Sequence, residues 1–139
     1  MKLKLFTIVV LLLILSGMVP GSGLDAFEIE PQTSAAGIQY ISGGIGAGER
    51  QDLEKMMDGY NPKVVLTEGS GYYLSKCRVI ILKSTSHIMV DTVTKGPWLM
   101  ARLDPGRYQI KALHRGIRQG ASVDVDPAGT QEVILNWNR

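Results

Sequence analysis

The spacing of apolar residues divides the chain into a short helical part and a longer β part. Between residues 49 and 60 apolar side chains recur at offsets of three, four and seven, the period of an amphipathic helix. Gly59 and the Asn61-Pro62 pair then end the helix. The spacing therefore predicts one short helix, whose apolar face carries Leu53, Met56, Met57 and Tyr60.

After residue 62 the period changes to two, as in strands that bury one face and expose the other. The alternation is clearest where Tyr108, Ile110 and Ala112 alternate with polar residues. Glycine, proline and aspartate clusters separate the apolar segments, and regularly spaced short strands of this kind indicate a sandwich or a barrel. Ile38–Ile41 is a candidate for an additional short strand. The seven expected strands are Lys63–Thr67, Lys76–Lys83, Ile88–Thr94, Trp98–Leu103, Arg107–Leu113, Gly120–Val125 and Gln131–Trp137.

The first 23 residues have the layout of a secretory signal peptide. Lys2 and Lys4 precede an apolar run over residues 5–15, which is too short to span a bilayer. Small and turn-forming residues follow, so we expect cleavage after Gly23, with Ala26 as the alternative site and an uncleaved membrane anchor as the competing interpretation. The expected organisation is a signal peptide (1–23), a flexible leader (24–37), a glycine-rich loop with the helix (38–62) and a β-sandwich domain (63–139).

Composition and charge narrow the class of partner. A chain of 139 residues has room for one domain. Its 15 basic and 13 acidic residues give a formal charge of +2, but two of the lysines belong to the signal peptide. The remaining charges balance and are interspersed, which gives no support for nucleic-acid binding or for a basic membrane-binding patch. After signal cleavage we therefore expect neither a nucleic-acid partner nor a membrane association.

One part of the β region resembles a known domain family. Cys77–Ile81 is an apolar strand, and Gly96–Ile110 contains the pattern Leu-x-Pro-Gly-x-Tyr that leads into the next strand. With the strand at Gly120–Val125, the segment Tyr73–Trp137 resembles the carboxypeptidase regulatory-like domain, a transthyretin-like β-sandwich common in bacterial envelope proteins. The resemblance implies a mainly β, seven-stranded antiparallel immunoglobulin-like or transthyretin-like sandwich with one short N-terminal helix, located in the periplasm. That family is a non-catalytic appendage, so the resemblance implies no peptidase activity.

Five residues in this segment are expected to be structural. Pro105 and Gly106 form a turn, and Tyr108 enters the core with its hydroxyl group able to reach upstream backbone, as in a tyrosine corner. Trp98 is expected to anchor the core. Cys77 is in register with apolar neighbours and is expected to be a buried small hydrophobe, with a reactive thiol or an intermolecular disulfide as the alternatives.

No residue pattern predicts catalysis, so the chain is expected not to be an enzyme. His87 and His114 are the only histidines, and neither has an acid at metal-ligand spacing. No cysteine–histidine pair is evident, and the glycines near residue 44 do not match a dinucleotide-binding motif. We therefore expect no catalytic residue, no cofactor and no bound metal.

The leading functional hypothesis is a non-catalytic envelope module that binds or stabilises another protein. Its glycine-rich loop and helix are expected to lie against a sheet edge and form the partner-binding face, because four glycines are costly in a merely structural connector. A competing interpretation is that this segment only covers an exposed edge strand. The alternative is a carbohydrate-binding module that uses exposed Tyr72, Tyr73 or Trp98, and a small enzyme ranks last. The candidate partner-binding residues are Gly43, Gly44, Gly46, Arg50 and Lys55.

Overall fold

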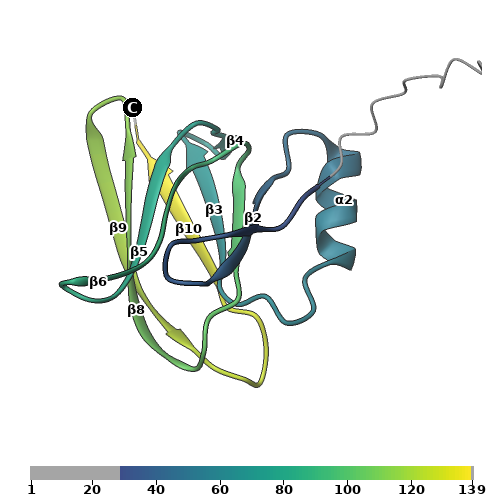
Figure 1. Cartoon of the computed structure of the whole chain (residues 1–139). Coiled ribbons are helices and arrows are strands. Elements are labelled where there is room, and N and C mark those ends of the chain that lie inside the picture. Colours follow the sequence, from purple (N-terminus) through teal and green to yellow (C-terminus); the bar gives the residue numbers. More distant parts are fainter. Residues whose placement is uncertain (1–28, 139) are drawn as a thin grey trace, which may run out of the picture.

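The computed structural model describes residues 29–138, which form a mainly β fold with two sheets and one helix (Figure 1). The expected signal peptide lies outside the described residues. Over residues 29–138, no helix is long and apolar enough to cross a membrane. The described part has ten strands, so the expected count of seven was too low. Two of the additional strands have only two residues, which is too short to produce a hydrophobic period.

The six-stranded sheet contains both ends of the described chain. Its strand order is β1-β2-β7-β3-β10, and β4 pairs with β3 beside this path. All of its pairs are antiparallel except β3–β10, which is parallel from Lys63 opposite Glu132 onward. The wholly antiparallel expectation was therefore wrong. The bounds are β1 Gln32–Thr33, β2 Gln39–Gly43, β3 Lys63–Glu68, β4 Tyr72–Tyr73, β7 Trp98–Ala101 and β10 Glu132–Trp137.

The parallel pair has a topological cause. Parallel strands need a long crossover connection, whereas antiparallel neighbours can be joined by a tight hairpin. Between β3 and β10 the chain forms the whole four-stranded sheet and then returns. A local hydrophobic pattern does not show which distant strand will pair with it, so the pairing of β3 with β10 could not be predicted.

The four-stranded sheet has the order β6-β5-β8-β9, and all of its pairs are antiparallel. Arg115 and Gly116 join β8 to β9, and both have positive φ angles (47° and 77°), as a two-residue type I′ hairpin turn requires. The bounds are β5 Arg78–Ser84, β6 His87–Val93, β8 Gly106–His114 and β9 Ile117–Val125.

The two sheets share one core. Strand β8 follows the predicted alternation, with Tyr108, Ile110 and Ala112 buried and the residues between them exposed. These side chains meet apolar residues of the other sheet, including Val64 and Leu99. This packing leaves each sheet with one outer face.

The helix covers the outer face of the six-stranded sheet (Figure 1). Helix α2 spans Ala47–Lys55, shorter than the predicted segment. The four predicted apolar residues do pack together with residues of β2, β3 and β7, but only Leu53 lies within the helix, because Met56, Met57 and Tyr60 follow its last residue. The helix therefore lies on the face of the sheet. The expected position against a sheet edge was wrong. Strand β3, covered on both sides, is almost entirely buried.

The N-terminal segments are part of the same fold. Gln32 and Thr33 pair with β2, and the Ser34 hydroxyl donates to the Met89 carbonyl at 2.6 Å. The expectation of a flexible leader was therefore wrong for these residues. Strand β2 is an integral strand of the six-stranded sheet, so residue 63 does not mark a domain boundary.

Candidate functional site

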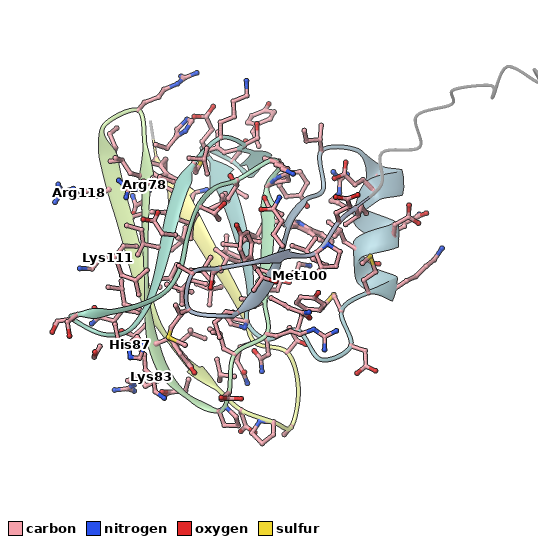
Figure 2. The ribbon with its side chains drawn as sticks, in the orientation of Figure 1. Arg78, Lys83, His87, Met100, Lys111 and Arg118 are labelled. Atoms are coloured by element: carbon pink, nitrogen blue, oxygen red, sulfur yellow. The ribbon has the colours of Figure 1, made fainter. Side chains whose placement is uncertain are left out.

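The outer face of the four-stranded sheet is the candidate site. The outward side chains of β8 are all exposed, and Leu113 retains 38% of its accessible surface. Figure 2 shows Arg78, Lys111 and Arg118 on the side of the molecule away from α2, with Lys83 and His87 further along the same side. Among residues 29–138 the two outer faces therefore differ, because a helix covers one and no helix covers the other.

Strand register brings the charged side chains of this face together. Leu113 on β8 lies opposite Arg78 on β5 and Arg118 on β9. Two residues earlier on β8, Lys111 lies opposite Ile80 and Gly120. Lys111 therefore has an aliphatic neighbour on one side and no side chain on the other.

A shallow hollow of about 360 Å³ forms over these two rows. Gly120 contributes to its shape, because a side chain there would stand beside Lys111 on the same face. Ile80 and Leu113 provide apolar surface within a rim of cationic groups. The hollow is lined by Arg78, Ile80, Lys111, Ala112, Leu113, Arg118 and Gln119.

Four cations of this face fall into two groups, and Lys83 lies further along the same side. The guanidinium group of Arg78 donates to both carboxylate oxygens of Asp91, at 3.1 and 2.9 Å. This hydrogen bonding, together with the opposite charge, lowers the pKa of Asp91. Arg107 and Asp124 form the same arrangement further along the face, at 2.9 and 3.2 Å, and the pKa of Asp124 is lowered for the same reasons.

Lys111 and Arg118 form the second group. Neither has a carboxylate partner among residues 29–138. The residues across from them on the neighbouring strand are Gly120 and Leu113, which carry no charge. The hollow therefore contains two cationic groups whose charge the fold leaves unpaired, beside exposed aliphatic surface.

The sequence-predicted partner-binding residues make internal contacts instead. The Gly44 N–H donates to Glu49 Oε1 at 3.0 Å, and Arg50 Nη1 donates to the Gly44 carbonyl at 2.8 Å. Gly43 and Gly44 are buried, and Gly44 has a positive φ of 95°, which favours glycine. Gly46 is exposed at the N-cap of α2, and Lys55 pairs with Asp52 at 3.7 Å on the surface. Two of the candidate glycines thus have structural reasons to be glycine.

Gly96 packs directly against the backbone of Gly43. A Cβ atom on Gly96 would overlap the carbonyl group of Gly43 and lie 2.9 Å from its Cα. The contact therefore requires that Gly96 has no side chain, whereas a Cβ atom on Gly43 would meet the side chains of Glu49 and Leu53. This close approach is made within the protein.

The three aromatic residues expected for sugar binding, Tyr72, Tyr73 and Trp98, do not share one exposed face. Trp98 is buried, with the ammonium group of Lys63 at 3.4 Å from its ring centroid, which confirms the expected core anchor and excludes an exposed platform there. Tyr72 and Tyr73 are exposed, but consecutive strand residues point to opposite faces. The Arg50 guanidinium group also covers the Tyr73 ring at 4.8 Å.

Cys77 is buried, as its register predicted, and burial raises its pKa to about 11. Its Sγ atom lies 3.5 Å from His114 Nδ1, so the statement that no cysteine–histidine pair is evident was wrong. The two residues are 37 positions apart, and the β5–β8 register places them across from each other. A thiol with this raised pKa remains protonated near neutral pH, so the pair does not provide an activated nucleophile.

The predicted tyrosine corner is confirmed. Tyr108 is almost fully buried, and its hydroxyl group donates to the carbonyl of Asp104, four residues upstream, at 2.8 Å. Burial also raises the pKa of Tyr108.

Gly106 begins β8, and Pro105 lines a second hollow of about 410 Å³ between loops at one end of the sheets. Asn61 fixes that end by donating to the carbonyls of Asp126 and Gly129.

Comparisons with known proteins assign no family: no protein-family model matches the chain, and no curated protein sequence matches it. In the described part of the chain, no group of three or more histidine, cysteine, aspartate or glutamate side chains is placed to hold a metal ion. Lys111 and Arg118 could not be singled out from the sequence, because their proximity depends on which residues of β8 and β9 face each other.

Proposed function

We propose that this chain is a non-catalytic binding module of the bacterial envelope, which engages a partner protein through the outer face of its four-stranded sheet. The observation that supports the proposal is the hollow, which combines unpaired Lys111 and Arg118 with the aliphatic side chains of Ile80 and Leu113. Charged groups without an internal partner cost little in water and provide complementarity to an oppositely charged surface. Exposed apolar residues among them add area that a partner can bury.

The envelope location and the domain type are parts of this proposal. The apolar run after Lys2 and Lys4 supports export. The Leu103-to-Tyr108 pattern, whose tyrosine hydroxyl bonds upstream backbone, is compatible with a transthyretin-like or immunoglobulin-like sandwich of the carboxypeptidase regulatory-like kind. The carbohydrate alternative has less support. Trp98 is buried, the Arg50 guanidinium group covers the Tyr73 ring, and Tyr72 points to the opposite face of β4 from Tyr73.

The test compares two variants with the same change in charge. The double variant Lys111→Glu/Arg118→Glu reverses the charge of the hollow, and Lys55→Glu/Lys95→Glu makes the same change at exposed positions outside it. Proteins crosslinked to the chain in intact envelopes are purified and compared. Melting curves establish first that both variants fold.

We expect the hollow variant to lose crosslinked adducts that the wild type and the control variant retain. Equal adducts from both variants would contradict the proposal. Loss of adducts in the control variant alone would move the binding face to the helix side, as the sequence argument had it.

A further inference from the structure

On the outer face of the four-stranded sheet, two arginines are paired with carboxylates of the described residues and two neighbouring cations are not. Arg78 and Arg107 each have an aspartate on the adjacent strand that binds the guanidinium group through both oxygens. Lys111 and Arg118 lie on the same face without such a partner. The fold thus leaves two carboxylate positions unfilled, side by side.

The spacing of the two cations limits what can fill those positions. Lys111 is paired with Gly120, so Arg118 is its diagonal neighbour on β9. Diagonal neighbours on one sheet face have Cα atoms about 7–8 Å apart. In an extended chain, residues i and i+2 point to the same side and are about 6.5–7 Å apart. Two acidic residues at alternate positions of an extended segment therefore match the two cations.

The apolar surface adds a third position. Leu113 lies between Arg78 and Arg118, and Ile80 lies beside Lys111 on the other side from Gly120. A side chain of the ligand two residues from the acidic pair points to the same face and can cover one of these aliphatic groups. The hollow of about 360 Å³ is large enough for inserted side chains and too shallow to enclose a whole ligand.

We propose that the hollow binds an extended segment of the partner protein with the pattern aliphatic-x-acidic-x-acidic. This inference rests on the proposed function, because it names the chemistry of the partner at the same site. Charge attraction alone would accept any acidic segment, whereas the strand register requires the two carboxylates at alternate positions. The order of residues in the segment is therefore the property to test.

The experiment uses three capped heptapeptides and the processed, exported chain labelled with nitrogen-15. The first peptide is Ser-Leu-Ser-Glu-Ser-Glu-Ser. The second, Ser-Leu-Ser-Ser-Glu-Glu-Ser, has the same composition with adjacent acids, and the third replaces both glutamates of the first by glutamine. Amide chemical shifts of Leu113 and Gly120 report on the hollow. Vesicles of phosphatidylglycerol are added separately as an anionic lipid surface.

We expect the first peptide to shift both amides and to bind at least fivefold more tightly than the second, with no shift from the third. Lys111→Gln/Arg118→Gln should remove the shifts, whereas Arg107→Gln, on the same face outside the hollow, should preserve them. Equal binding of the first two peptides would overturn the inference, and so would binding to vesicles without binding to the first peptide. If the peptides fail while envelope crosslinks still depend on Lys111 and Arg118, this inference falls and the proposed function stands. If the crosslinks do not depend on those residues, the proposed function falls.

Discussion

Replacing Gly96 by alanine should strongly destabilise the protein. The added Cβ atom would overlap the Gly43 carbonyl group and approach its Cα to 2.9 Å, whereas carbon atoms in contact are normally about 3.5–4.0 Å apart. Both neighbours are backbone, so no side-chain rotation can relieve the overlap. The β2–β7 pairing at Gly43 opposite Trp98 lies beside this contact and would have to shift.

The expected cost is about 3 kcal/mol, the upper part of the range for overpacking in an interior. With a urea m value of about 2 kcal/mol/M, the denaturation midpoint should fall by about 1.5 M. Gly48→Ala provides the matched control, because this helical glycine has nothing within 4 Å of an added Cβ. The better helix propensity of alanine should raise stability by roughly 0.5–1 kcal/mol.

Opposite shifts of the two midpoints would establish that Gly96 is required by internal packing. A Gly96→Ala midpoint equal to that of the wild type would refute the steric argument.

Three further predictions concern single side chains. Tyr108→Phe should fold but lose the hydrogen bond to Asp104, at a cost of roughly 1 kcal/mol in urea unfolding, and an unchanged midpoint would argue against that bond. The Cys77 thiol, with its pKa raised to about 11, should react with a thiol reagent at pH 8 only as fast as the chain unfolds; immediate labelling of the native protein would contradict its burial. Because Arg78 lowers the pKa of Asp91 from 3.8, this carboxylate stabilises the fold above its unfolded pKa, and the contribution is lost as pH falls through the folded pKa. Asp91→Asn should therefore have a small destabilising effect at pH 6 that diminishes as the pH falls below the unfolded pKa, and an effect independent of pH would rule out the ion pair as its cause.

Local pattern was sufficient for much of the β architecture. Strand β8 exposes every second residue, so its alternating sequence predicted the buried set Tyr108, Ile110 and Ala112. The period of 3.6 also located the helix around Leu53 and the apolar cluster that it joins, but it extended the helix too far, because Met56, Met57 and Tyr60 reach that cluster from the segment after Lys55. In both cases one face of the element packs against an apolar layer and the other faces water. Apolar residues then recur with the period of the element, and the sequence alone shows this period.

Features that depend on distant pairing were not predictable. Val64 and Val65 of β3 are both buried, because the shared core covers one face and α2 the other, so this strand does not alternate in exposure. Its parallel pairing with β10 depends on a crossover through the whole four-stranded sheet. The candidate site has the same origin, since Lys111 and Arg118 become neighbours only once β8 and β9 are paired in register.

Photocrosslinking from defined positions tests the central claim most directly. A photoreactive amino acid is placed at Leu113, in the proposed binding face, and in a separate variant at Ile45, an exposed residue of the glycine-rich loop. Irradiation of intact envelopes should yield a discrete adduct from position 113 and none from position 45. An adduct from position 45 without one from position 113 would contradict the assignment of the binding face to the four-stranded sheet.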